Sequence, residues 1–274
     1  MKKLISSMII LPAMIFCQNV TAQSVEGEEN PGKTEDIESY ANSDSAKAFL
    51  DSAQHLMQLG KMDEALNLCK KATEIQPENN DEAYIAWFRL CIGTEKTDEA
   101  MQVIDAWIEH NPENTQAWLY KGFAEAHLNH PEKALEAFDM LIKLQPEEGS
   151  NYVGRGQMLY ALERYEEAIE AFDRSASMDS SRTDVMGMKT AALAKLGRFD
   201  EALVLINKTL EQNPDDISGI YNRACLYSIK GDKVNALADL RRAIEIEPSM
   251  KEYARNDEDF KSLYENEDFI KLTK

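Results

Sequence analysis

The stretch ALEAFDMLIKLQPEE, residues 134–148, decides the fold because the chain repeats its pattern at a fixed spacing. Thirty-four residues later the chain reads AIEAFDRSASMDSSR, and after another thirty-four it reads ALVLINKTLEQNPDD. Further copies are ALADLRRAIEIEPSM at 236–250, AMQVIDAWIEHNPEN at 100–114 and ALNLCKKATEIQPEN at 65–79. A fixed period of this length predicts stacked supersecondary units, each too small to bury its own apolar face.

Aligned on these lines, the sequence contains six units, with Asn80 as the one extra residue: 46–79, 81–114, 115–148, 149–182, 183–216 and 217–250. Each unit carries two successive patterns of helical period, as the third unit shows with Trp118, Leu119, Phe123 and later Phe138. The sequence therefore predicts six helical hairpins.

Three positions within the unit predict how the hairpin is built. Position 15 is glycine in three units, which suits a helix end with positive φ: Gly60, Gly197 and Gly231. Position 32 is proline in five units, which ends the second helix: Pro77, Pro112, Pro146, Pro214 and Pro248. Position 20 is alanine in all six, which lets two helices approach closely: Ala65, Ala100, Ala134, Ala168, Ala202 and Ala236.

These features resemble the tetratricopeptide repeat (TPR) family over residues 46–250, in a chain of exported bacterial type. The family pattern has an aromatic residue at position 4, small residues at 8, 20 and 27, an aromatic at 24 and proline at 32. The resemblance implies an all-α, right-handed α-solenoid of six helix-turn-helix units. The second unit departs from the pattern with Phe88 at position 8 and Trp107 at position 27, so we expect its hairpin to be splayed or repacked. Residues 251–274 are expected to form a C-terminal capping helix over the last unit, with the charged side chains directed outward.

The resemblance also implies a concave groove lined by positions 2, 5, 9, 12 and 13 of each first helix. Transferred to this chain, the N-terminal units contribute Leu50, Gln54, Met57, Ile85, Arg89, Ile92, Leu119, Phe123 and His127. The later units contribute Val153, Gln157, Tyr160, Ala191, Lys195, Tyr221 and Cys225. The family's carboxylate clamp needs Lys and Asn at positions 5 and 9, and neither Leu50 with Gln54 nor Ile85 with Arg89 fits it.

This groove is more apolar than the acidic surface around it, which predicts a site for a partner protein or peptide. A helix or extended segment would contact Ile85, Phe123 and Tyr160, while Arg89 meets one carboxylate. The alternative is that these residues pack under their neighbours or under the spacer 23–45. We therefore expect a non-enzymatic protein–protein interaction scaffold or adaptor. A self-associating component of an envelope assembly, and hence a homo-oligomer, is the other candidate.

The N-terminal 22 residues have the layout of a bacterial signal peptide. Lys2 and Lys3 precede an apolar run, and Ala22 ends a sequence of small residues suited to cleavage before Gln23. Phe16 directly before Cys17 argues against a lipoprotein, and an uncleaved anchor is the remaining alternative. Residues 23–45 read as a flexible acidic spacer. We expect an exported protein of the periplasm or cell envelope, or a secreted one, with no transmembrane span after cleavage.

The net charge of −19, which cleavage would change to −21, argues against nucleic-acid binding because such a surface repels phosphates. No catalytic or nucleotide-binding motif occurs, so we expect no enzyme activity and no cofactor. His127 and His130 have a spacing that could hold a metal, yet no carboxylate is clearly placed with them, and we predict no metal site. Cys69 and Cys91 are expected to be buried thiols, with a disulfide between them as the alternative.

Overall fold

The structure, a computed structural model, describes residues 46–75, 77, 80–179 and 183–274. The predicted signal peptide (1–22) and acidic spacer (23–45) lie outside the described residues. Within those residues every regular element is a helix, so the predicted all-helical class is confirmed. No helix in the described ranges has the length and hydropathy that crossing a bilayer requires.

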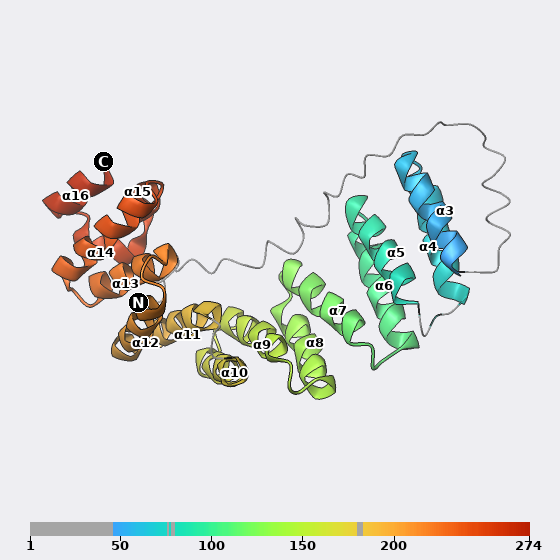
Figure 1. Cartoon of the computed structure of the whole chain (residues 1–274), viewed down its shortest axis with the longest axis horizontal. Helices are drawn as coiled ribbons and strands as arrows, with labels where there is room; N and C mark the ends of the chain where they lie inside the picture. Colours follow the sequence, from blue (N-terminus) through green and yellow to red (C-terminus); the bar gives the residue numbers. More distant parts are fainter. Residues whose placement is uncertain (1–45, 76, 78–79, 180–182) are drawn as a thin grey trace. The chain divides into compact units, whose positions relative to one another are not determined.

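Twelve helices form six antiparallel pairs, and each pair lies within one of the 34-residue units (Figure 1). The first helices of the pairs are α3 (Ala46–Gln58), α5 (Asp81–Gly93), α7 (Thr115–His127), α9 (Gly149–Ala161), α11 (Thr183–Lys195) and α13 (Ile217–Ile229). The second helices are α4 (Met62–Ile75), α6 (Thr97–His110), α8 (Pro131–Leu144), α10 (Tyr165–Met178), α12 (Phe199–Gln212) and α14 (Lys233–Ile246).

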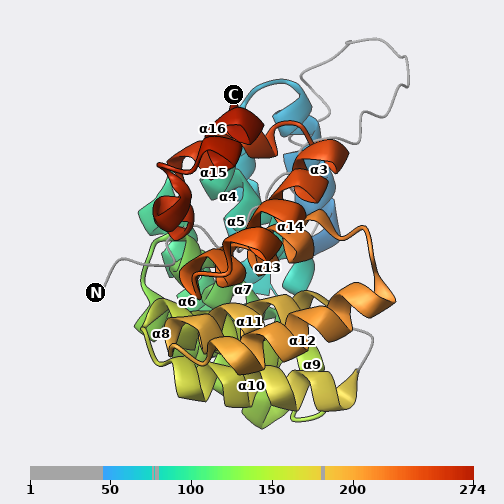
Figure 2. The same ribbon diagram turned by 90° about the vertical axis from the view of Figure 1, so that its left-hand side faces the viewer.

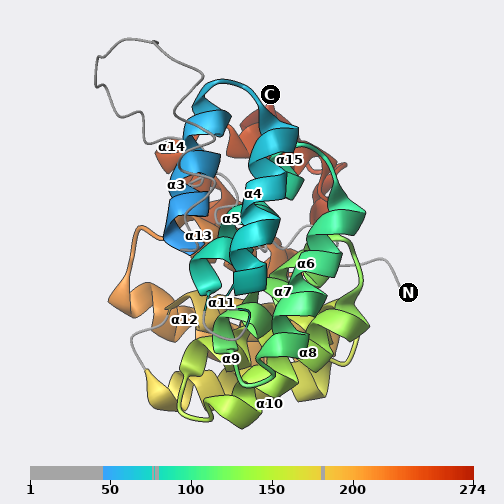
Figure 3. The same cartoon turned by 90° about the vertical axis from the view of Figure 1, so that its right-hand side faces the viewer.

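The described chain divides into two compact units, one up to Pro146 and one from Glu147. In the N-terminal unit α3–α8 pack in chain order, and Figure 3 shows α3 and α4 as neighbours. In the C-terminal unit α9–α14 follow the same order, and Figure 2 shows α13 and α14 beside the last helices of the chain. Each unit has its own hydrophobic core. This consecutive packing of helix pairs is the α-solenoid arrangement that the repeat predicts.

The alanines at position 20 explain why the paired helices lie so close. All six have an exposed fraction of 0%. In the third and fourth units the glycine at position 8 serves the same purpose, because the aromatic ring at position 24 lies directly against it. A Cβ placed on Gly122 would lie 3.1 Å from the ring of Phe138, and one on Gly156 would lie 2.4 Å from the ring of Phe172.

The second hairpin is repacked around its tryptophan. Trp107 has an exposed fraction of 1% and stacks on Tyr84, with ring centroids 5.4 Å apart and planes within 4°. Its indole Nε1 donates to Oδ1 of Asp81 over 3.0 Å. Asn114 donates to the same oxygen and also caps α7 by accepting from the backbone N–H of Ala117. The bulky residue at position 27 is thus accommodated by stacking and by a hydrogen bond for its polar atom.

All six turns use the same backbone geometry, including those that lack glycine. Position 15 has a positive φ in every unit: Gly60 (73°), Glu95 (59°), Asn129 (60°), Glu163 (59°), Gly197 (76°) and Gly231 (82°). In each turn the backbone N–H of position 16 donates to the carbonyl of position 11, as Arg164 does to Leu159 over 2.9 Å. This is the Schellman closure of a helix, and it requires the left-handed region at position 15.

Glycine at positions 95 and 163 is therefore expected to stabilise the protein. The left-handed conformation costs a residue with a Cβ about 1–2 kcal/mol, and glycine is free of that cost but loses more entropy on folding. We expect Glu95→Gly and Glu163→Gly each to raise the free energy of unfolding by about 0.5–1 kcal/mol in urea titrations. The reverse change, Gly197→Glu, is the matched control and should destabilise. Destabilisation by both glycine variants would contradict this explanation of the turns.

The chain ends in a cap on the last hairpin, formed by α15 (Met250–Asn256), the 3-10 helix η1 (Glu258–Leu263) and α16 (Glu267–Thr273). Phe260, Leu263 and Phe269 of the cap are buried in the core of the C-terminal unit. Helices α15 and α16 contact α14, while η1 lies against α13. The predicted cap is thus present, but it is three short helices rather than one.

Candidate functional site

The first helices of the N-terminal unit present a partly apolar face at the predicted groove positions. Gln54, Arg89 and His127 are exposed, and Leu50, Ile85 and Leu119 are half-buried. The exposed fractions of the large apolar side chains among them are 39% for Met57, 46% for Ile92 and 41% for Phe123. We call these nine residues the first-helix face. Its members occupy corresponding positions of three successive units, so the face continues from α3 through α5 to α7.

Arg89 supplies the cation of the first-helix face. Its guanidinium group is exposed and forms no ion pair or hydrogen bond with any residue that the structure describes. Phe123 is held in place because its ring packs edge-on against Phe138, with centroids 5.8 Å apart. The face therefore combines preformed apolar contacts with a positive charge, which suits a segment that carries apolar side chains and a carboxylate.

In the C-terminal unit the predicted groove residues are less accessible. Gln157 is half-buried and donates from Nε2 to Sδ of Met188 over 3.6 Å. Tyr160 is half-buried against the ring of Tyr165, and burial raises the pKa of its hydroxyl. Lys195 is half-buried too, and burial lowers the pKa of its ammonium group.

Four of the residues that the sequence assigns to the groove are buried. The prediction that they are accessible to a partner is therefore wrong. Val153 is 7% exposed, in helix α9, against which both α10 and α11 pack. Ala191 lies in the core of the same unit. Tyr221 and Cys225, exposed by 1% and 0%, are covered by η1 of the cap, which the repeat pattern does not include.

The cap holds two buried carboxylates against α13, contrary to the expectation that its charges face outward. Asp257 and Asp259 are each 3% exposed. Asp257 accepts a hydrogen bond from the hydroxyl of Tyr221 over 2.8 Å and one from the backbone N–H of Asp259 over 3.0 Å. These contacts compensate its removal from water, and the second one caps η1. In the sequence, the only sign of this arrangement is the run of three acidic residues directly before Phe260 in DEDF.

The same place contains a group of potential metal ligands. One ligand atom each of Cys225, Asp257 and Asp259 lie within 4.8 Å of one another, the one such group of three in the described ranges. Burial, reinforced by the two carboxylates, raises the pKa of the Cys225 thiol well above its usual value. Within the described residues, Asp257 links the group by its contacts with the hydroxyl of Tyr221 and with Sγ of Cys225.

His130 has a carboxylate partner that the sequence interpretation missed. Its Nδ1 lies 2.8 Å from Oε2 of Glu125, and Nζ of Lys121 lies 3.2 Å from Oε1 of the same carboxylate. Glu125 is 2% exposed, and Lys121 also pairs with Asp105 of α6 over 2.6 Å. Burial by itself would raise the pKa of Glu125, but the hydrogen bonds from His130 and Lys121 outweigh it and the pKa is lowered. The group thus connects α6, α7 and the start of α8.

Replacing Glu125 with glutamine is expected to destabilise the N-terminal unit in a pH-dependent way. At neutral pH the loss should be about 1–3 kcal/mol, since a buried charged hydrogen-bond network is broken. A lowered folded pKa means that the carboxylate contributes stability above its ordinary pKa of 4.5 and loses it as the pH falls through the folded pKa. In urea titrations, the difference in free energy of unfolding between the natural protein and Glu125→Gln should be smaller at about pH 3 than at about pH 7. The exposed Glu132→Gln is the control, and a pH-independent difference would contradict the account.

The cysteines of the N-terminal unit are free thiols. Cys69 and Cys91 are both fully buried. Burial raises their pKa values to about 12 and about 11, and their mutual influence contributes to the former. Both act as small apolar residues of the core, which is the first of the two interpretations that the sequence allows.

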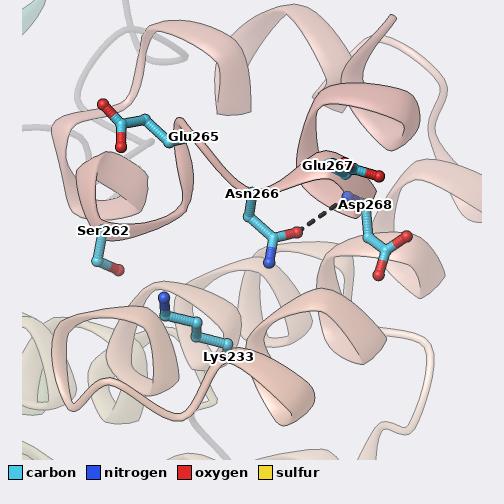
Figure 4. A pocket seen from close by; sticks show the side chains of 6 residues that line it. All are labelled: Lys233, Ser262, Glu265, Asn266, Glu267 and Asp268. Atoms are coloured by element: carbon cyan, nitrogen blue, oxygen red, sulfur yellow. Dashed lines mark hydrogen bonds between the residues drawn. The ribbon is translucent and has the colours of Figure 1, made fainter.

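A pocket of roughly 480 Å³ lies between the start of α14 and the loop that joins η1 to α16 (Figure 4). Its lining residues are Lys233, Ser262, Glu265, Asn266, Glu267 and Asp268. Oδ1 of Asn266 accepts from the backbone N–H groups of Asp268 and Phe269, so this side chain caps α16. The pocket is therefore bordered by a helix-capping loop, and it contains none of the predicted site residues.

Comparison with known proteins relates the chain to one family. Models of the tetratricopeptide repeat match residues 56–119, 128–183, 159–221 and 217–250, which together span more than half of the chain. A comparison with curated protein sequences gives no match.

Solved structures agree with this assignment. A tetratricopeptide repeat protein from Parabacteroides merdae is 20% identical, with a TM-score of 0.60 over 84% of this chain and 99% of that protein. YrrB, described as a TPR protein with an unusual peptide-binding site, is 24% identical, with a TM-score of 0.55 over 66% of this chain and 92% of its own. MamA from Desulfovibrio magneticus is 18% identical, with a TM-score of 0.57 over 62% and 97%. At these identities the likeness shows the fold alone. The chain has six helical hairpins with a buried alanine at position 20 of each, and tetratricopeptide repeat models match more than half of it. The chain therefore belongs to the tetratricopeptide repeat family.

Proposed function

We propose that the protein is a non-enzymatic adaptor that binds a segment of another protein on the first-helix face of its N-terminal unit. The observation that carries the proposal is the exposure of Met57, Ile92 and Phe123 around the exposed Arg89. Apolar side chains gathered on one surface of a folded protein usually mark a site of interaction.

The fold explains how such a face binds without chemistry. Helices α3, α5 and α7 are held by hairpin packing, so the contact residues are ordered before a ligand arrives and its binding costs less entropy. A partner segment would lay apolar side chains against Met57 and Ile92 and direct a carboxylate to Arg89. The description of YrrB as a peptide-binding TPR protein supports a peptide as the class of ligand.

The place of action that we propose is the periplasm or cell envelope. Support comes from the sequence of residues 1–22, with Lys2 and Lys3, an apolar run and small residues up to Ala22. Expression in a bacterial host with fractionation and N-terminal sequencing tests it. A mature chain that begins at Gln23 in the envelope fraction supports export, whereas an intact cytoplasmic chain contradicts it.

Affinity capture from an envelope extract tests the binding site. Three baits without residues 1–22 are compared: the natural sequence, Arg89→Glu with Phe123→Ala, and a control, Lys70→Glu with Ile75→Ala. The control makes equivalent changes at exposed positions of α4 in the same unit.

A protein that is captured by the natural and control baits and lost by the Arg89/Phe123 bait supports the proposal and names the partner. Equal capture by all three baits contradicts the site. Capture of further copies of the chain alone favours a self-associating envelope component instead.

A further inference from the structure

The groove positions of the last unit are occupied by the chain itself. Positions 5, 9 and 12 of α13 are Tyr221, Cys225 and Ser228, each exposed by no more than 1%. The same positions of α5 in the N-terminal unit are Ile85, Arg89 and Ile92, which are half-buried or exposed. The difference arises because η1 of the cap lies against α13, whereas no described segment covers α5 in this way.

The contacts of this segment have the character of ligand recognition. Phe260 is fully buried and packs edge-on against the ring of Tyr221, with centroids 5.6 Å apart and planes at 80°. Asp257 precedes Phe260 by three residues. The hydroxyl of Tyr221 donates to Oδ2 of Asp257 over 2.8 Å, and Sγ of Cys225 lies 3.9 Å from the same oxygen. Ser262 adds a hydroxyl contact of 3.1 Å with Ser228. The segment thus contributes an aromatic ring and a carboxylate, and α13 contributes an aromatic ring and a hydroxyl donor.

The second acid of the segment also influences groove residues of the preceding units electrostatically. Asp259 is buried and acts electrostatically on Tyr160 of α9 and on Lys195 of α11. For Lys195, burial lowers the pKa and the charge of Asp259 opposes that change. The charge of Asp259 thus acts on first-helix residues of three successive units, Tyr160, Lys195 and Tyr221.

We propose that residues 257–263 are an intramolecular ligand of the α13 surface, and that this surface binds an acidic-aromatic segment of another protein, of the form Asp-x-Asp-Phe, when the cap is displaced. The cap suits such a role, since η1 has six residues and α15 and α16 have seven each. Helices this short are not stable alone, so contacts with the repeat hold the segment in place. Because it is tethered, it competes at high effective concentration, and the site stays closed until those contacts weaken. The α13 surface belongs to the C-terminal unit, so a test of this proposal is independent of a test of the first-helix face.

Binding of a peptide in trans tests the proposal. The probe is a fluorescent peptide with the sequence of residues 254–266, ARNDEDFKSLYEN. It is titrated against the full natural chain, against Asp257→Ala with Phe260→Ala, and against the control Glu258→Ala with Glu265→Ala. The control removes charge at two exposed positions of the cap, one within the segment (Glu258) and one just after it (Glu265), and leaves the buried contacts of the segment intact.

We expect the Asp257/Phe260 variant to bind the peptide at least about tenfold more tightly than the natural and control chains. A peptide with alanine in place of its first aspartate and its phenylalanine should lose this binding, as should Tyr221→Phe introduced into the variant. Equal binding by all three chains, or no binding by a variant that still unfolds cooperatively, would overturn the proposal. If the double variant does not unfold cooperatively, Phe260→Leu, which keeps an apolar side chain, takes its place with the same two outcomes.

Discussion

Trp107→Ala is expected to lower the free energy of unfolding of the N-terminal unit by about 3–5 kcal/mol, the range for truncating a large buried aromatic residue. The family pattern favours a small residue at this position, so an alignment alone would predict a harmless or stabilising change. The structure predicts the opposite, because the indole is 1% exposed, stacks on Tyr84 and donates to Asp81. Removal would leave a cavity in the second hairpin, and Asp81 would lose a hydrogen-bond donor.

Urea titration followed by circular dichroism measures this effect, and Trp107→Phe is its matched control. Phenylalanine keeps a ring against Tyr84 but has no N–H for Asp81, so Trp107→Phe should lower the free energy of unfolding by about 1–2 kcal/mol. If Trp107→Ala lowers the free energy of unfolding by less than about 1 kcal/mol, the hairpin must collapse to fill the cavity that the indole leaves. That result would contradict the repacking described for this unit.

Gly156→Ala is expected to destabilise the C-terminal unit by about 1–3 kcal/mol, although alanine is the better helix former. The added Cβ would lie 2.4 Å from the ring of Phe172, closer than any real contact, so the ring or one helix of the hairpin must shift. Phe172 is 1% exposed and lies in the packed core, which leaves it little room to move.

Gly187→Ala is the matched control, since it also lies inside a first helix and its Cβ would meet no atom within 4 Å. That variant should be neutral or stabilised by up to about 1 kcal/mol, as helix propensity alone predicts. Gly122→Ala would place a Cβ 3.1 Å from Phe138, so its effect on the free energy of unfolding should lie between those of Gly156→Ala and Gly187→Ala. If the urea midpoints of the Gly156 and Gly187 variants change equally, close packing at position 8 is not the reason for glycine there.

The helix pairs follow from the sequence because they depend on periodic local signals. Alanine at position 20, the proline after the second helix and the apolar spacing each recur in nearly every unit, and the structure confirms the resulting hairpins. The left-handed turns at Glu95 and Glu163 are less evident, since neither residue favours positive φ. There the register of the other units, rather than the residue type, indicates the geometry.

The candidate site was less predictable because burial depends on what covers a helix. Tyr221 and Val153 occupy the same position of their units as Ile85, yet only Ile85 is partly accessible. The cap that covers Tyr221 lies outside the repeat, so no periodic signal places it. Likewise, Glu125 and His130 meet across a helix end, and the buried Asp257 depends on a hydroxyl 36 residues earlier in the chain.

Site-specific photo-crosslinking in the source cells tests the central claim most directly. A photoreactive amino acid is placed at Ile92 of the first-helix face or at Ile75 of α4, whose exposed fractions are 46% and 37%. The proposed adaptor predicts that illumination joins the Ile92 chain to another protein in high yield and that the Ile75 chain forms no such product. Products that are equal at both positions, or that contain only copies of the chain itself, would contradict binding of a partner protein on this face.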